Sequence, residues 1–352
     1  MLGNYHLEAR QTVSFLSSII IYLSAILLGL TVSTIILLSS GLSIINLWNE
    51  FILLLITSPK NLSAVIVQSA PLVLVGLAAA ISFKVRFWNI GIEGQIIFGA
   101  IAATYVAIHN IGPPGFRLLL MGLASAAGGI FWIALPILLK IKLKVNEIIT
   151  TLLLNYIAFN FLLHLLYGNW KDPDTGFPSS ELYDASELFQ KIGWYDVNSS
   201  VFVISIFVIL SYFTFYISRF GFLTKFLNSN LDMARSMGIS VVFLISFTAL
   251  ISGGLSGVCG FVISAGIESR MTQSFFVGYG FSGILIAFLA RENPIGVVIV
   301  AILFSMLMIG GQSLQVFYQV PFAMVQLVQA IIVMTVAGSE FFLRYKIRRH
   351  GQ

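Results

Sequence analysis

Long apolar runs recur along this chain from about residue 13 to residue 343, and they limit what it can fold into. Runs of about 18 or more apolar residues are long enough to cross a hydrocarbon core of about 30 Å as helices. Only 9% of the 352 residues are charged, against about 25% in soluble domains. The runs are also too continuously apolar for the alternating strands of a membrane barrel. The sequence therefore predicts an all-α, polytopic membrane protein.

About ten apolar runs define the predicted transmembrane helices. They cover residues 13–38, 62–83, 93–111, 117–139, 148–167, 201–218, 241–263, 277–290, 294–310 and 323–343. The first run is too long for the core of a signal peptide, so we expect it to be retained. The eighth and ninth runs are short, which favours helices that stop within the membrane. Residues 1–352 are predicted to form a single transmembrane domain.

The distribution of lysine and arginine predicts the orientation of the chain. With a cytoplasmic N-terminus, 14 of the 19 basic residues lie in inner loops and five lie outside. Cytoplasmic loops carry such an excess of positive charge, and an even number of spans then places both termini inside. The predicted outer loop at residues 168–200 is acidic. Because the basic residues are spread over several loops, a nucleic-acid partner is not expected.

One polar segment, Asn89 to Gln95, lies where the third predicted helix enters the bilayer. It places the carboxylate of Glu93 and the amides of Asn89 and Gln95 among glycines. A charge near the membrane interior costs about 2.5–3.5 kcal/mol on an insertion scale, so it usually faces a cavity or a partner. The segment suits a hydrogen-bonding wall for a polar solute. Equally, Asn89 can cap the helix, Glu93 can sit favourably in its first turn, and the glycines permit close packing.

A second polar stripe lies on the fifth predicted helix. Glu147, Thr151 and Asn155 recur at intervals of four residues and so share one face, with Asn160 and His164 further towards the outside. Hydrogen bonding between packed helices explains such a stripe more simply than direct contact with a solute. His164 has no second ligand at a spacing suited to a metal site.

The segment at residues 218–240 is predicted to be cytoplasmic and to contain a short amphipathic helix. Gly238 can end this helix in a left-handed turn. The helix suits docking on a second protein, and an ordinary interfacial loop is the alternative.

A short motif occurs twice in the chain. Gly91-Ile92-Glu93 follows the second predicted helix, and Gly266-Ile267-Glu268 follows the seventh. The two helices are predicted to run in opposite directions, so the motif hints at an inverted repeat.

Motifs for chemistry are missing from the sequence. It contains no GxxxxGK[ST] phosphate loop, so the chain is not expected to hydrolyse ATP by that mechanism. It also lacks paired metal-ligand motifs and a GxSxG nucleophile elbow. We therefore predict a non-catalytic chain without a cofactor or a metal of its own. Its single cysteine, Cys259, lies in an apolar run and is assigned to packing.

Four segments of the chain resemble the permease subunits of bacterial ABC importers for simple sugars and nucleosides. The likeness is greatest to the longer permease of nucleoside systems. The segments are Asn89–Gln95 (NIGIEGQ), Val145–Ile157 (VNEIITTLLLNYI), Asp232–Ile239 (DMARSMGI) and Gly278–Gly296 (GYGFSGILIAFLARENPIG). Small departures from the family pattern occur at Ser229, Met233 and Ala290.

The resemblance implies a ten-helix permease in the bacterial cytoplasmic (inner) membrane, surrounded by lipid. Its implied partners are a second permease, in a heterodimer, an extracytoplasmic solute-binding protein, and an ATP-binding subunit with two nucleotide-binding domains that carries ATP and Mg. Residues 230–239 would form the coupling helix that docks on this ATPase. The coupling residues implied are Asn230, Ala234, Arg235, Gly238 and Ile239.

The function expected is uptake of a polar solute, a nucleoside or a simple sugar, by alternating access. An uncharged solute suits a path lined by amides and hydroxyls. The residues expected to line the path are Asn89, Glu93, Gln95, Glu147, Thr151 and Asn155. The alternative is an ion-coupled secondary transporter in which Glu93, Glu147 or Glu268 titrates.

Overall fold

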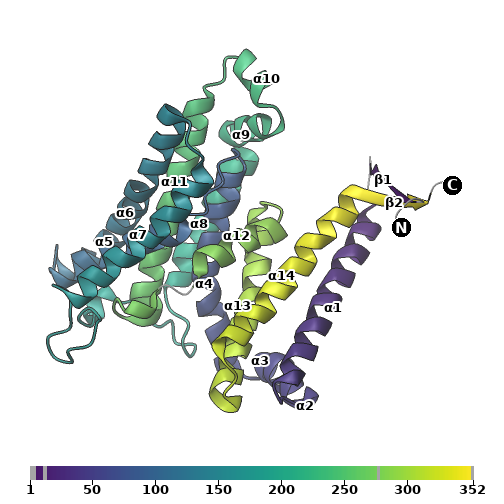
Figure 1. The fold of residues 1–352 in the computed structure, drawn as a ribbon. Coiled ribbons are helices and arrows are strands. Elements are labelled where there is room, and N and C mark those ends of the chain that lie inside the picture. The colour runs from purple at the N-terminus through teal and green to yellow at the C-terminus, as the bar shows by residue number, and fades with distance from the viewer. Residues whose placement is uncertain (1–4, 11–13, 276–277, 350–352) are drawn as a thin grey trace. The chain divides into compact units, whose positions relative to one another are not determined.

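The computed structural model describes residues 5–10, 14–275 and 278–349 of the chain (Figure 1). It forms two compact units. The first contains Met1–Asn61 and Met306–Gln352, and the second contains Leu62–Ser305. Two predicted helix starts, residues 13 and 277, lie outside the described residues.

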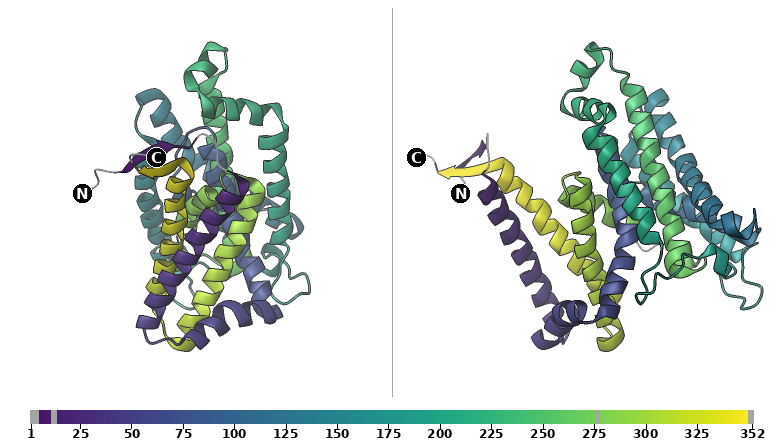
Figure 2. Two further views of the ribbon diagram at one scale, coloured as in Figure 1. Left: turned by 90° about the vertical axis from the view of Figure 1, so that its right-hand side faces the viewer. Right: turned by 180° about the vertical axis from the view of Figure 1, so that it is seen from behind.

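The first unit is built around a pair of long helices, α1 (Phe15–Ser39) and α14 (Phe322–Arg344), which run side by side in Figures 1 and 2. Strand β1 (Tyr5–Ala9) pairs antiparallel with β2 (Tyr345–Arg349). The N-terminal and C-terminal segments therefore lie together, as the prediction of both termini on one side requires. Which side of the membrane this is stays a prediction.

Short helices follow α1 in the first unit, and the sequence analysis did not predict them. These are α2 (Ile44–Trp48), a π-helical turn (Asn49–Leu53) and α3 (Leu54–Thr57). The Ser43 hydroxyl accepts a hydrogen bond from the Asn46 amide and so starts α2. Within this unit the buried Glu50 accepts a 2.5 Å hydrogen bond from Ser313, which offsets the burial of its carboxylate.

The second unit is a helical bundle with α5, α6 and α11 packed together at its centre. Its helices are α4 (Pro59–Phe83), α5 (Ile92–Ile108), α6 (Pro114–Leu143), α7 (Glu147–Tyr167), α8 (Ser200–Tyr212), α9 (Arg219–Ser229), α10 (Leu231–Ser236), α11 (Val241–Ile263), α12 (Tyr279–Leu289) and α13 (Pro294–Tyr318), the last of which continues into the first unit. Single π-helical turns extend α8 to Ile217 and α11 to Glu268.

Glycines bring the backbones of the central helices into direct contact. A Cβ atom on Gly257 of α11 would lie 2.1 Å from the Ser125 carbonyl oxygen of α6, and one on Gly260 would lie 2.2 Å from that of Ile96 in α5. Small residues let helices approach closely in lipid, where packing drives association. Cys259, between these glycines, is fully buried, in agreement with its predicted packing role.

The predicted helices correspond well to the observed ones, with one clear error. Helix α13 extends to Tyr318, whereas the sequence analysis ended it at residue 310. The Gly310-Gly311 pair does not end the helix. Instead these glycines pack against Phe51 and Val325, whose side chains would lie 2.7 and 2.1 Å from added Cβ atoms. The ninth predicted span is therefore not short.

The helical fold is confirmed, but the number of crossings stays a prediction. Eight helices in the described part of the chain are long and apolar enough to span a membrane. The other two predicted spans, α5 with 17 residues and α12 with 11, are shorter.

The two copies of the Gly-Ile-Glu motif have different local structures. Gly91–Glu93 leads into α5, whereas Gly266–Glu268 ends the π-helical turn after α11. The inverted repeat also stays a prediction.

The loop between α7 and α8, predicted to be outside, is tied to the bundle by a buried ion pair. The Arg117 guanidinium lies 2.7 Å from the Glu187 carboxylate, and both side chains are buried. Arg117 also donates to Asn110, and Glu187 accepts from the Asp184 amide in a capping box. Because each buried charge is paired and hydrogen-bonded, the loop has a defined anchor.

Further contacts fasten the same loop. Ser180 and Met271 exchange two hydrogen bonds, and the Tyr183 hydroxyl lies 2.5 Å from that of Thr104. Burial raises the pKa of Tyr183 to about 12, so its phenol stays protonated. A hydrogen bond from Thr175 lowers the pKa of Asp172 below its ordinary value, so that carboxylate stays charged.

Replacing Arg117 with methionine is expected to release this loop. The change leaves the buried Glu187 carboxylate without its counter-charge, so protease cleavage within residues 168–199 should accelerate about tenfold. Cleavage is measured on intact cells or spheroplasts by immunoblot. The control is Lys191→Met, which breaks the exposed Lys191–Asp196 pair of the same loop and should change little. Equal cleavage rates in the two variants would contradict the anchoring role.

Candidate functional site

The amides of Asn89 and Gln95 bind each other. The Asn89 Nδ2 donates to Gln95 Oε1 at 3.0 Å, and Gln95 Nε2 donates back to Asn89 Oδ1 at 2.8 Å. Asn89 also donates to the Ser252 hydroxyl, which donates to the Ala78 carbonyl oxygen. All three polar side chains are buried. The network joins α4, the segment before α5, and α11 in a water-excluded region, where hydrogen-bonded polar groups are expected.

Glu93 holds the N-terminus of α12. Its Oε1 accepts a 2.9 Å hydrogen bond from the Gly278 amide, and its Oε2 accepts a 2.5 Å bond from the Gly280 amide. The first amides of a helix lack partners within the helix, and a carboxylate there is also favoured by the helix dipole. Gly280 packs directly on Glu93, with no room for a Cβ atom. The carboxylate, which is buried, therefore positions a helix from far along the sequence.

Asn155 and Thr151 face the start of α5. The Asn155 Oδ1 accepts from the Gly94 amide at 2.8 Å, and its Nδ2 donates to the Ile90 carbonyl at 3.0 Å. Thr151 is fully buried and lies directly against Gly91. A Cβ atom added to Gly91 would lie 2.8 Å from the Cβ of Thr151. This face of α7 supplies partners for the irregular backbone that leads into α5, as required where backbone leaves helical geometry inside a membrane protein.

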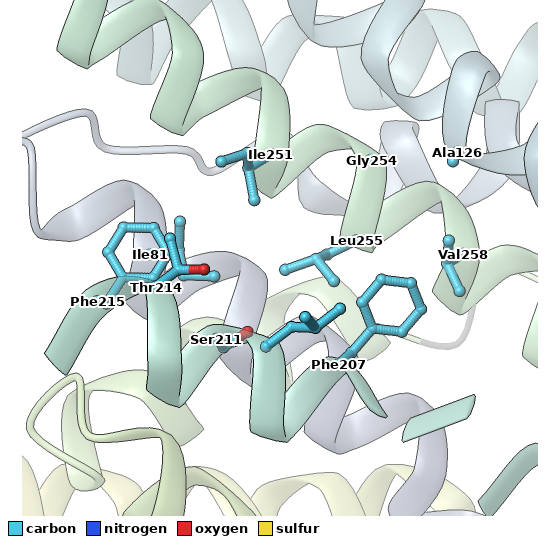
Figure 3. Close-up of a pocket in the computed structure, with 11 residues that line it drawn as sticks. Ile81, Ala126, Phe207, Ser211, Thr214, Phe215, Ile251, Gly254, Leu255 and Val258 are labelled. Atoms are coloured by element: carbon cyan, nitrogen blue, oxygen red, sulfur yellow. The ribbon is translucent and has the colours of Figure 1, made fainter. Parts of the chain in front are cut away.

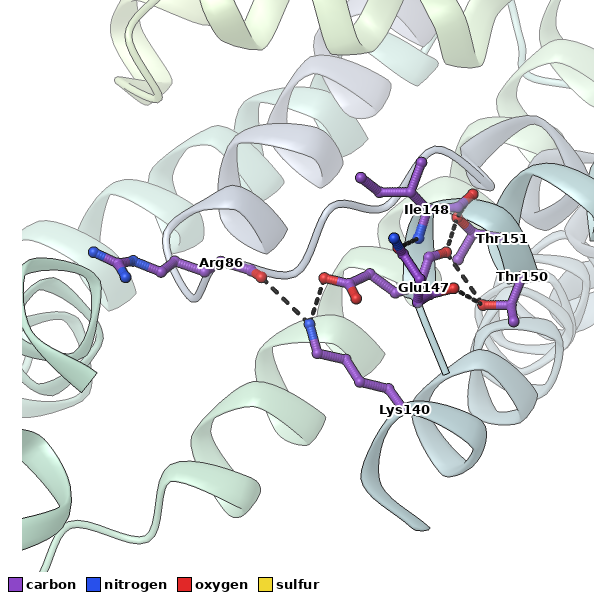
Figure 4. A network of polar contacts seen from close by, with 7 residues as sticks. Arg86, Lys140, Glu147, Ile148, Thr150 and Thr151 are labelled. Atoms are coloured by element: carbon purple, nitrogen blue, oxygen red, sulfur yellow. Dashed lines mark hydrogen bonds and ion pairs between the residues drawn. The ribbon is translucent and has the colours of Figure 1, made fainter. Parts of the chain in front are cut away.

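Glu147 belongs to a charged network at the start of α7 (Figure 4). Asn146 caps the helix by accepting from the Ile148 amide. The Glu147 carboxylate pairs with Lys140 of α6, whose ammonium group also lies 3.4 Å from the Arg86 carbonyl oxygen. The Arg86 guanidinium donates to the Asn228 carbonyl at 2.6 and 3.1 Å. These contacts connect α7 to the end of α9.

The predicted coupling segment forms two helices, α9 and α10, at one end of the bundle of the second unit (Figures 1 and 2). The Asn230 side chain accepts from the Asp232 and Met233 amides and so caps α10. Gly238 adopts the left-handed conformation, φ +76°, that was predicted for the end of this helix.

One side of α10 is buried in the bundle and the other is exposed. Ala234 is fully buried in a cluster with Val85, Phe87 and Leu227, and Ile239 packs against this cluster. By contrast the Arg235 side chain is 63% exposed. Two of the five predicted coupling residues thus anchor the helix instead of facing outward.

Met233 on α10 and Met237, which directly follows the helix, are exposed, and the sequence analysis did not select them as contact residues. They are four residues apart and so share a face of the helix. Exposed methionines on a surface helix are a signal that could have identified them, because flexible thioethers suit protein contacts. Arg235 is exposed as well, but it lies two residues from each methionine and so on another side of the helix.

Two charged side chains that follow helices of the second unit, Lys84 and Glu292, have shifted pKa values. Burial lowers the pKa of Lys84, which follows α4, and raises the pKa of Glu292, which follows α12. Their mutual attraction opposes both shifts. They link the ends of α4 and α12 electrostatically.

A cavity of about 230 Å³ lies between α8 and α11 (Figure 3). Its walls include Phe207, Leu210, Ile251 and Leu255, and two hydroxyls line it, those of Ser211 and Thr214. Such walls do not offer a polar solute the hydrogen bonds it would lose on leaving water. None of the six predicted path residues lines this cavity. Among the described residues no group of three or more His, Cys, Asp or Glu side chains could hold a metal ion.

The six predicted path residues therefore contact side chains and backbone within the second unit. Asn89 and Gln95 hydrogen-bond each other, Glu93 and Asn155 bind backbone groups, Thr151 packs on Gly91, and Glu147 pairs with Lys140. Contact with a solute stays a prediction for each of them. Long apolar helices, buried hydrogen bonds between them and an exposed helix at one end of the bundle are typical of a polytopic membrane subunit that docks on a second protein.

Comparison with known proteins identifies the family. Residues 61–337 match the family described as branched-chain amino acid transport system / permease component, and the chain belongs to this family. It is 36% identical to the glucose ABC transporter permease protein TsgB13 of Haloferax volcanii over 304 residues, covering 83% of this chain and 80% of that protein. It is 31% identical to the guanosine ABC transporter permease protein NupP of Bacillus subtilis, covering 96% and 98%.

A third relative is the nucleoside ABC transporter permease protein NupB of Lactococcus lactis, with 27% identity over 84% of each chain. The resemblance to sugar and nucleoside permeases is thereby confirmed, and the chain is a permease subunit of an ABC importer. The comparisons do not support the ion-coupled alternative.

Proposed function

We propose that this chain forms the path for a nucleoside or a simple sugar across the bacterial cytoplasmic membrane. The single observation that carries the proposal is the geometry of α10, which is anchored in the bundle through Ala234 and exposes Met233, Arg235 and Met237. A helix held in this way transmits a push or pull from a docked protein to the bundle. The relatives named for guanosine, nucleosides and glucose support a polar, uncharged solute.

The proposed assembly contains three partners. An ATP-binding subunit with two nucleotide-binding domains carries ATP and Mg and docks on α10. A second, different permease completes the path, and an extracytoplasmic binding protein delivers the solute. ATP hydrolysis occurs on the partner, and this chain contributes no catalytic residue.

The contacts of Arg86, Lys140 and Glu147 support a route from the ATPase to the path. Arg86 binds the last turn of α9, and its carbonyl lies near Lys140, which pairs with Glu147 at the start of α7. Asn155 on α7 then contacts the backbone on both sides of Gly91, and Glu93 holds α12. A displacement of α9 and α10 would reach α7 and α12 through these contacts.

Replacing Arg235 with glutamate is expected to lower uptake of radiolabelled nucleoside or ribose at least about tenfold, because a reversed charge on the docking face opposes a complementary partner. Uptake is measured in cells that express the neighbouring transport genes, with and without the ATPase gene. The matched control is Lys225→Glu, an equal reversal at an exposed position of α9. If the two variants lost uptake equally, the proposal that the ATPase docks on α10 in particular would be wrong. Uptake by this chain alone, collapsed by a protonophore, would overturn the importer.

A further inference from the structure

Helix α7 carries polar side chains on two opposite faces. The first face is buried and includes Thr151 and Asn155, whose contacts within the bundle are described above. The second contains Tyr156, Asn160, His164 and Tyr167, all exposed. At 3.6 residues per turn these four side chains fall within an arc of about 80° that is centred roughly opposite the buried face. We call them the outer stripe of α7.

The outer stripe has unused hydrogen-bonding capacity. The Asn160 Nδ2 donates only to the Tyr156 carbonyl oxygen of its own helix, at 2.7 Å. The Tyr167 hydroxyl lies 3.0 Å from Gln273 Oε1. His164 makes no side-chain hydrogen bond or ion pair with the described residues. The Tyr156 side chain is 62% exposed.

The exposed surface of α6, in the same unit, has a different composition. The exposed side chains on the outer half of α6 are apolar, including Phe116, Leu119 and Leu123. An imidazole and an amide in the same environment would lose their hydrogen bonds to water, and polar residues within spanning helices almost always face a cavity or another protein. We therefore expect the outer stripe to face a cavity or a partner protein.

Its chemistry also indicates what it faces. The four side chains combine two phenols, an amide and an imidazole, and none is a carboxylate, an ammonium or a guanidinium. Aromatic rings stack on flat or apolar ring faces, while the amide and imidazole exchange hydrogen bonds with hydroxyls and heteroatoms. This combination fits an uncharged, polar ring compound better than an ion.

We propose that Tyr156, Asn160 and His164 line the outer half of the solute path and contact the transported nucleoside or sugar. This inference rests on the proposed function and assigns the solute a different face of α7 from the one selected in the sequence analysis. Thr151 and Asn155 keep the helix in place, and the outer stripe contacts the solute.

Cysteine labelling in membranes that contain the complete transporter tests this assignment. Asn160→Cys and His164→Cys are each treated with a water-soluble thiol reagent, with and without nucleoside or ribose at about ten times its KM. The controls are Leu119→Cys and Leu123→Cys on α6, about 7 and 14 Å from the outer end of their helix, against about 10 Å for Asn160 and about 5 Å for His164. Cys259 is buried, so the unmodified chain supplies the background.

Cysteines at 160 and 164 should react, and solute should slow the reaction at least about fivefold by occupying the site. The α6 cysteines should stay unreactive. His164→Leu and Asn160→Leu should reach the membrane at normal levels and lower uptake about tenfold, because the solute then loses a hydrogen-bonding partner.

Absence of reaction at 160 and 164, or reaction that solute does not slow, overturns the assignment. So does unchanged uptake by both leucine variants. In the same cells, uptake that needs the ATPase gene shows that the proposed function stands even when the outer stripe fails. Uptake independent of that gene counts against the proposed function itself.

Discussion

Replacing Glu93 with alanine is expected to abolish uptake and to destabilise the protein. The carboxylate accepts the amides of Gly278 and Gly280, and both oxygens are used. Without it, two buried donors at the start of α12 lose their partner, at about 1–3 kcal/mol each. Thermal stability in detergent is measured by fluorescence-detected size-exclusion chromatography, and uptake is measured in cells with the complete transporter.

Two further variants separate positioning from a role in proton coupling. Glu93→Gln keeps one carbonyl oxygen as an acceptor and should retain part of the stability that Glu93→Ala loses. Glu268→Gln removes an exposed carboxylate and should leave uptake unchanged. If Glu93→Ala were as stable as the unmodified chain, its function as an anchor for α12 would be wrong.

Replacing Gly257 with alanine is expected to have the second large effect. The added methyl group would lie 2.1 Å from the Ser125 carbonyl oxygen, so α6 and α11 must separate or shift. Overpacking costs about 1–3 kcal/mol, and we expect the upper end because the clash is with backbone. The measured quantities are the melting temperature in detergent and the amount of folded protein in the membrane.

The matched control for this change is Gly254→Ala on the same helix. Its added Cβ would lie 3.4 Å from the Ile130 side chain, an ordinary contact with a group that can move. This variant should be as stable as the unmodified chain, or slightly more so because alanine favours helix over glycine. Similar losses for both alanines would mean that the close backbone contact with Ser125 is not what makes Gly257 sensitive to substitution.

The arrangement of α7 shows where sequence reasoning succeeded and where it could not. Spacing of four residues correctly grouped Thr151 with Asn155 on one face, and interhelical packing was the simpler explanation. The sequence could not show that these side chains bind the backbone around Gly91 and Gly94. Helical periodicity also places Asn160 and His164 away from that face, but only the structure shows which of the two faces is buried, because burial depends on which helices are neighbours.

Glu93 gives a second example. Its position in the first turn of α5 suggested that it serves its own helix. In the structure it serves α12, about 185 residues further on. No local pattern predicts a pair at this separation, since such contacts arise only when the helices pack. Similarly, the sequence analysis ended a helix at residue 310, whereas in the structure this helix continues to Tyr318 and its Gly310-Gly311 pair packs against Phe51 and Val325.

The sequence by itself determined that this chain is a helical membrane protein, and it predicted the positions of the long helices. The reason is that lipid requires each backbone group to find a partner within its own helix, so length and hydropathy carry the information. Only the tertiary structure decided which polar groups form hydrogen bonds between helices and which remain exposed. That choice depends on contacts between residues far apart in the chain, such as Glu93 with Gly278 and Arg86 with Asn228.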